Sequence, residues 1–160
     1  MDQQNLFVKM ALQAWETNSK RATTIFNGFS DEDLFLEIAP GKNRVIYLLG
    51  HLTAINDRML PLLGLGERMY PQLDEPFLSS PDKTVAALPS AKELREYWTK
   101  SNEILSGHFN RLSAGEWFQK HTQMTDEDYA KEPHRNKLSV LMNRTNHLSF
   151  HLGQLVLIKK

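Results

Sequence analysis

The most informative absence in this sequence of 160 residues is cysteine, which does not occur at all. Without cysteine the chain has no disulfide, no thiolate ligand for zinc or an iron–sulfur cluster, no thiolate nucleophile and no site for covalent haem attachment. A chain free of cysteine suits a reducing compartment, so we expect a cytoplasmic protein. Any reaction of this protein that uses a thiol has to take that thiol from another molecule.

Net charge and long apolar runs are also lacking. Nineteen lysines and arginines balance nineteen aspartates and glutamates, so the composition gives no reason to expect a nucleic acid or an anionic membrane as partner. The longest apolar run, residues 45–50, is far shorter than the roughly 20 residues that span a bilayer. No signal peptide is visible, and glycine and proline are too scarce for a low-complexity chain. We expect one domain, residues 1–160, with no nucleic-acid or membrane partner.

Apolar residues recur at intervals of three and four along most of the chain, and no stretch alternates as a strand would. This spacing predicts four helices, over residues 3–28, about 44–63, from 91 onward and about 136–158. A capping box formed by Ser90 and Glu93 marks the start of the third helix. Residues 64–89 are predicted to be a long connection with at most one short helix, and residues 113–135 to be irregular.

Helices of this length measure about 30–38 Å, the dimensions of a four-helix bundle. The 26 residues of the connection 64–89 can cross the whole length of a bundle, so the second and third helices can run parallel. The predicted fold is therefore all-α, a four-helix bundle of the up-down-down-up type with a long crossover between the second and third helices. The residues expected to face its core include Met142 and Val156 near the C-terminus and the apolar stripe of the first helix, Leu6, Met10, Ala14, Asn18, Ala22, Ile25 and Phe29.

Three histidines form the constellation that points to chemistry. His147 and His151 are four residues apart in the last helix and so lie one turn apart on one face. His51 lies about 10 Å from the start of the second helix, and His151 lies about 10 Å from the end of the last. If these two helices run in opposite directions, the three imidazoles share one level and can bind a divalent metal ion that keeps open positions. Three hydrogen-bonded histidines at a helix seam explain the same pattern, and the residues alone leave both interpretations open.

The remaining histidines fit a metal site less well. His108 lies on the apolar face of the third helix but about 27 Å from the level of the triad in the predicted arrangement, so we expect it at a hydrogen-bonded seam. His121 and His134 lie in polar, irregular segments. The pair in the last helix lacks the glutamate of the H-E-x-x-H motif, so a protease of that class is not expected.

Four other residues carry two interpretations each. Asn18 lies near the centre of the apolar stripe of the first helix, where it can orient a ligand histidine or fix helix register. Arg144, one turn before His147, and Arg58, in the second helix, can bind an anionic substrate or form surface salt bridges. Gly153 permits the close approach of a neighbouring backbone, either in tight helix packing beside the metal or at a dimer seam.

Two blocks of sequence resemble the DinB/YfiT-like superfamily. The first is the turn Pro40-Gly41-Lys42-Asn43 followed by Leu48-Leu49-Gly50-His51-Leu52, and the second is Asn146-His147-Leu148-Ser149-Phe150-His151-Leu152-Gly153-Gln154-Leu155. The resemblance extends in outline over nearly the whole chain. It implies an up-down-down-up four-helix bundle, often dimeric, in which His51, His147 and His151 bind a divalent metal ion, variously zinc, nickel, iron or manganese.

The resemblance says less about the reaction. The superfamily includes metal-dependent transferases that use low-molecular-weight thiols such as bacillithiol or mycothiol, a maleylpyruvate isomerase, and hydrolases. We therefore expect a divalent-metal-binding enzyme, a thiol S-transferase or hydrolase, that activates an exogenous low-molecular-weight thiol or water for a small-molecule substrate and forms a homodimer. The alternative is a non-catalytic, stress-associated or ligand-binding bundle with a structural or adventitious metal.

Overall fold

The computed structural model describes residues 2–158, and within that range all of the regular secondary structure is helical. The four longest helices are α1 (Gln3–Asn27), α2 (Val45–Leu62), α3 (Ala91–Phe109) and α6 (Lys137–Leu155). The predicted all-α class is confirmed, and the predicted helix limits agree with these to within three residues. The predicted domain, residues 1–160, extends beyond the described range at both ends.

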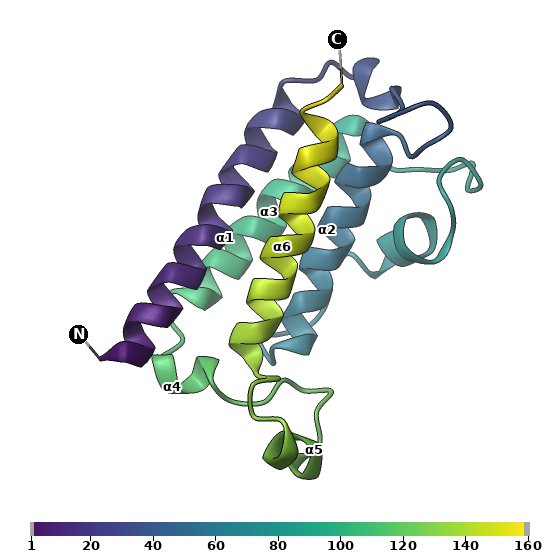
Figure 1. Ribbon diagram of the computed structural model, residues 1–160. Coiled ribbons are helices and arrows are strands. Elements are labelled where there is room, and N and C mark those ends of the chain that lie inside the picture. Colours follow the sequence, from purple (N-terminus) through teal and green to yellow (C-terminus); the bar gives the residue numbers. More distant parts are fainter. Residues whose placement is uncertain (1, 159–160) are drawn as a thin grey trace.

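The direction of the long helices decides which residues share one level. Figure 1 shows them side by side, with α1 and α6 running toward one end of the molecule and α2 and α3 toward the other. α1 packs most extensively on α6, and α2 packs most extensively on α3. Because α2 begins at the end of the molecule where α6 finishes, its second turn lies level with the last turns of α6 (Figure 1).

The connections contain more helix than predicted. The crossover between α2 and α3 holds two consecutive short helices, η2 (Pro71–Leu73) and the π-helical η3 (Glu75–Ser79), where at most one was expected. The segment predicted to be irregular contains α4 (Ala114–Trp117) and α5 (Asp126–Lys131). By contrast, η1 (Asp33–Phe35) follows α1 where Ser30 and the acidic residues 31–33 indicate a capped helical turn in the sequence, and the amide of Asp33 does donate to the Ser30 hydroxyl at 3.0 Å. α4 begins with a capping box between Ser113 and Glu116, the same local signal that correctly predicted the start of α3.

All three tryptophans are buried and help to hold the long helices together. Trp15 and Trp117 pack edge-to-face on Phe109 with ring centroids 5.9 and 5.2 Å apart, and Trp98 packs in the same way on Phe26 at 5.7 Å. Such pairs contribute roughly 0.5–1.5 kcal/mol each beyond the burial of their area. They tie α3 to α1 and to α4, so the aromatic core lies between these helices.

The predicted inward face of α1 is wrong over the first half of the helix but correct at Ala22, and Phe29 just beyond the helix is also buried. The buried stripe consists of Val8, Trp15, Ser19, Ala22 and Phe26. By contrast, Leu6 is 49% exposed and Met10 59%. Met142 of α6 and Val156, which directly follows α6, were also predicted to face inward and are 53% and 64% exposed. α1 carries apolar residues on two flanks, and periodicity alone does not tell which flank meets the core.

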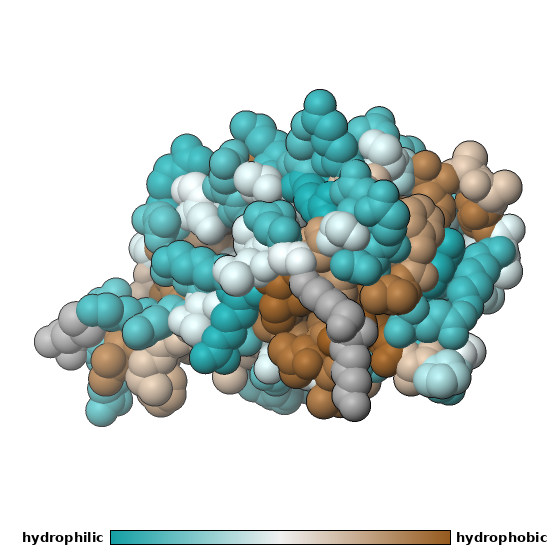
Figure 2. Space-filling model, turned by 90° about the horizontal axis from the view of Figure 1, so that it is seen from above, coloured by the Kyte–Doolittle hydropathy of each residue, from teal (hydrophilic) through white to brown (hydrophobic). Residues whose placement is uncertain are grey.

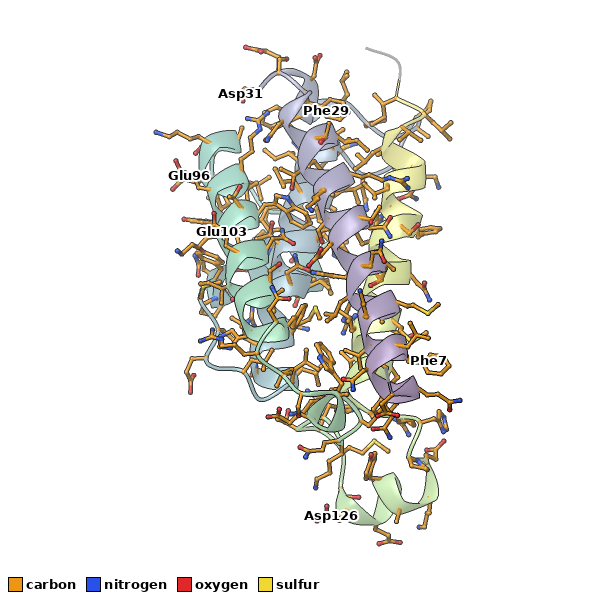
Figure 3. All side chains as sticks on the ribbon, turned by 90° about the vertical axis from the view of Figure 1, so that its left-hand side faces the viewer. Phe7, Phe29, Asp31, Glu96, Glu103 and Asp126 are labelled. Atoms are coloured by element: carbon orange, nitrogen blue, oxygen red, sulfur yellow. The ribbon has the colours of Figure 1, made fainter. Side chains whose placement is uncertain are left out.

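The exposed flank of α1 lies beside α6. Figure 3 shows Phe7, which is 63% exposed, projecting from the first turns of α1 on the side where α6 lies. Among the described residues, none of the helices combines the length and the apolar character that crossing a bilayer requires.

Candidate metal centre

Three imidazoles from two helices converge on one point. His51 comes from the second turn of α2, and His147 and His151 come from successive turns of α6. The Nε2 atom of His147 lies 3.2 Å from that of His51 and 3.0 Å from that of His151. The ligand atoms of all three lie within 4.8 Å of one another, and all three side chains are half-buried.

Hydrogen bonds at the far side of two rings fix which nitrogen faces the centre. The Nδ1–H of His51 donates to the carbonyl oxygen of Phe77 at 2.9 Å, and that of His151 donates to Oε1 of Gln154 at 2.7 Å. Because these oxygens can only accept, both rings carry their proton on Nδ1 and present a bare Nε2 lone pair to the centre. Such outer partners orient metal-binding histidines in general.

The arrangement fits a divalent metal ion. Two nitrogens bound to one ion at about 2.1 Å lie about 3.0 Å apart at a right angle and about 3.4 Å apart at the tetrahedral angle. The Nε2 separations of 3.2 and 3.0 Å fall in this range. Without an ion, the Nε2 of His147 faces two lone pairs and carries at most one proton to offer them, whereas a cation would accept a lone pair from each ring.

The rings are also kept neutral, which is the form that binds metal. Burial, together with the smaller effect of the neighbouring charges of His151, His51 and Arg144, lowers the pKa of His147 to about 4. Burial likewise lowers the pKa of His51 and His151 below the ordinary value. The Nδ1 atom of His147 is buried and has no hydrogen-bond partner within the described residues.

The carbonyl that orients His51 belongs to the crossover between α2 and α3. Phe77 lies in η3, and its ring packs so closely over Gly50 that a Cβ there would overlap it. The last carbonyls of a short helix have no partner within it, which leaves that of Phe77 free to accept from His51. Glycine immediately before His51 therefore allows the crossover to approach α2 closely.

Ion pairs hold the crossover on α2. The carboxylate of Asp57, which is fully buried, accepts from Arg68 Nε at 2.7 Å and from the backbone amides of Met69 and Tyr70 at 2.7 and 3.1 Å. At the other end, the guanidinium of Arg44 pairs with Asp82 at 2.6 Å. The crossover is thus attached to α2 both before Phe77, at residues 68–70, and after it, at Asp82. The position of the Phe77 carbonyl therefore depends on these contacts.

The two candidate arginines differ in their surroundings. Arg58 pairs with Asp74 at 2.7 Å and is largely exposed, which is the surface salt bridge that the sequence left as one alternative. Arg144 is half-buried, forms no ion pair or hydrogen bond within the described residues, and has a buried Nε without a partner. Burial lowers the pKa of Arg144, and the nearby charge of Arg58 adds to the shift.

Several predicted residues lie away from the centre. Asn18 does not make the hydrogen bond expected of a residue that orients a ligand histidine, because its amide donates to the Ala14 carbonyl of its own helix at 3.0 Å. His108 lies in the last turn of α3, at the end of the molecule near α4 and away from His51 (Figure 1). His134 is exposed and His121 half-buried.

The reason suggested for Gly153, tight helix packing beside the metal, is wrong. A Cβ at this position would meet nothing within 4 Å, so no neighbouring segment approaches it closely within the described chain. It instead lines an open groove of about 660 Å³ between α1 and α6, together with Asn18, Ile25 and Leu152.

Sequence reasoning missed the groups that orient the rings. Gln154 follows His151 by three residues, so helical spacing alone places it beside that ring, and this signal was available. Phe77 was not predictable in this way, since it is 26 residues from His51 and acts through its backbone. The glycine that matters for close packing is Gly50 rather than Gly153.

Comparison with known proteins agrees with the geometry. The chain matches the family model of the DinB superfamily over residues 14–155, a range that contains all three histidines. Among the curated proteins, none matches the chain.

Proposed function

Because the chain belongs to the DinB superfamily and brings three imidazole nitrogens to one point, we propose that it is a divalent-metal-dependent enzyme, a thiol S-transferase or hydrolase. The observation that carries this proposal is the convergence of three Nε2 atoms with two of the rings held by their Nδ1–H groups. Nitrogen ligands of this type suit zinc, nickel or iron, with manganese as a further candidate from the family resemblance.

The histidines would hold the metal through Nε2, and Phe77 and Gln154 would keep His51 and His151 in the tautomer that binds it. A divalent ion with open positions lowers the pKa of a bound thiol or water and so makes a nucleophile at neutral pH. The chain has no cysteine, so the thiol would be an exogenous small molecule.

A non-catalytic bundle with a structural or adventitious metal is the alternative. Structural zinc sites are closed by four protein ligands, whereas catalytic sites keep a position for water or substrate. Within the described residues, the group of side chains able to hold an ion here has three members, His51, His147 and His151. The missing fourth ligand favours the catalytic proposal.

Metal analysis followed by a thiol screen tests the proposal. The protein is purified without added metal, its metal content is determined by elemental analysis, and samples reconstituted with zinc, nickel, iron or manganese are screened for conjugation of small thiols to an electrophilic dye. We expect about one ion per chain and metal-dependent conjugation or hydrolysis. Stoichiometric metal without any turnover would support the non-catalytic alternative, and no bound metal would reject both.

We further propose that the four long helices constitute an up-down-down-up bundle that pairs through α1 and α6 as a homodimer. The support is apolar exposure along one groove between α1 and α6, where Phe7 is 63%, Met10 59% and Met142 53% exposed. Figure 2, which looks onto the end of the molecule where α6 finishes, shows apolar surface open to solvent there, and Val156 is 64% exposed. Contiguous apolar surface of this kind marks interaction sites.

The mass of the protein in solution tests the homodimer. Light scattering after size-exclusion chromatography should give twice the chain mass for the wild type and the single mass for a variant with Phe7→Glu and Met142→Glu. Leu36→Glu, at an exposed apolar residue outside α1 and α6, serves as the control and should leave the dimer intact. A wild-type monomer at high concentration would reject the homodimer.

A further inference from the structure

Arg144 differs from the other arginines that are half-buried. Arg44, Arg68 and Arg95 each pair with an aspartate at 2.5–2.7 Å. Arg144 has no carboxylate within 4.0 Å among the described residues, and its Nε, like that of Arg95, is buried without a hydrogen-bond partner. A half-buried guanidinium with an unsatisfied donor is costly unless an anion reaches it, so this side chain has an unmet requirement for a partner.

Arg144 lies on the same face of α6 as the metal centre, so an anion bound to it would lie near that centre. Arg144 lies three residues before His147 and seven before His151, so the three side chains follow one face of α6. Arg58, the neighbouring cation, is already paired with Asp74 and offers less free charge.

From this placement we propose that Arg144 binds an anionic oxyacid group, a carboxylate in the first instance, on the small molecule whose other end occupies the metal centre. The inference rests on the proposed function and adds a substrate class to it, namely thiols or substrates that carry a carboxylate. The planar guanidinium donates two parallel hydrogen bonds to such a group, and burial strengthens them. Arg58 is not assigned this role.

Calorimetry on the zinc-loaded protein tests the assignment with two probes, 3-mercaptopropionate, which carries a carboxylate, and 2-mercaptoethanol, which does not. Arg144→Gln should weaken binding of 3-mercaptopropionate about tenfold and change that of 2-mercaptoethanol less than twofold. Arg58→Gln is the matched control and should leave both affinities within about threefold, as expected for loss of an exposed pair. Zinc content should be unchanged in both variants. Equal effects of Arg144→Gln on the two probes would overturn the inference.

A readout without metal separates this inference from the proposed function. In metal-free protein labelled with nitrogen-15, sodium propionate should shift the Nε–H resonance that Arg144→Gln removes. A shift in a protein that binds no metal would reject the proposed function and sustain the anion site. Metal binding with no propionate-induced shift and with equal effects of Arg144→Gln on the two thiols would reject the anion site and leave the proposed function standing. If Arg144→Gln fails to fold, Arg144→Lys is used instead. Lysine keeps the charge but lacks the two parallel N–H donors of the guanidinium, so the affinity for 3-mercaptopropionate should still fall at least threefold.

Discussion

The two flanks of α6 differ in how far the rest of the chain covers them. On the flank that meets α2, polar groups from distant parts of the chain find one another, so that His147 contacts His51 and the crossover supplies Phe77. On the flank that meets α1, Met142 is 53% exposed, and Gly153 opens onto a groove. One helix thus has a flank closed within the chain and a flank whose apolar side chains are left to solvent.

The difference shows what a hydrophobic pattern can and cannot report. Apolar spacing identifies side chains that a helix can bury on one face, but it does not tell which of them the chain itself covers. Leu6, Met10 and Met142 satisfy the helical spacing as well as Trp15 does, yet only Trp15 is buried. The closed flank should therefore be sensitive to small changes, and the open flank tolerant of them.

Removal of a ligand on the closed flank has the largest expected effect. His51→Ala leaves two histidines on α6, so zinc affinity should fall by more than the roughly 10–100-fold that loss of an outer partner costs. Elemental analysis and competition with a chromogenic chelator measure the loss. His108→Ala, in the last turn of α3, is the control and should keep full metal content. Stoichiometric zinc in the His51→Ala variant would remove His51 from the site.

Loss of the buried aspartate that holds the crossover comes next. Asp57→Ala leaves the Nε of Arg68 and the amides of Met69 and Tyr70 without their acceptor, so the free energy of unfolding should fall by about 3 kcal/mol. Urea denaturation measures it. Asp31→Ala removes a partner of Arg95 at a 66% exposed side chain and should cost under about 1 kcal/mol. Similar losses in the two variants would mean that the crossover is not held by Asp57.

The two glycines beside the histidines contrast the flanks directly. Gly50→Ala forces a methyl group into the ring of Phe77, so it should destabilise the protein by about 1–3 kcal/mol and weaken zinc binding through the displaced carbonyl. Gly153→Ala adds a methyl group where nothing lies within 4 Å and should stabilise the helix by up to about 1 kcal/mol. Denaturation curves and zinc titrations of both variants give the comparison, and a tolerated Gly50→Ala would contradict it.

The closed flank should also make stability depend on pH. The pKa of His147 is about 4 in the folded protein against about 6.5 in the unfolded chain. Between these values the unfolded state binds the extra proton, so the metal-free protein should lose stability as pH falls from 6.5 toward 4 and show no such effect above 6.5. His147→Gln should have a shallower slope over that interval in urea denaturation, and an unchanged slope would show that this ring is not buried neutral.

Much of this structure was predictable because its determinants are local. The capping box at Ser90 and the spacing of His147 and His151 both act within one turn of helix, so the start of α3 and the shared face of the pair were correct. The short helices of the crossover and the carbonyl of Phe77 depend on contacts with residues far away in the sequence, such as the pairing of Asp57 with Arg68. No local pattern encodes such contacts.

The smallest expected effect lies on the open flank, where adjacent residues of α6 provide the test. Met142→Ala removes a side chain that is 53% exposed, so at protein concentrations where the chain is monomeric the free energy of unfolding should change by less than about 0.5 kcal/mol. Leu141→Ala, at the fully buried neighbour, should cost about 2–5 kcal/mol through the cavity it leaves. If the flank is covered by a second copy of the chain, the cost of Met142→Ala should grow as the protein concentration is raised, because dimerisation stabilises only the folded state. A loss above 1 kcal/mol for Met142→Ala at the lowest concentration would mean that this flank, like the other, is closed within the chain.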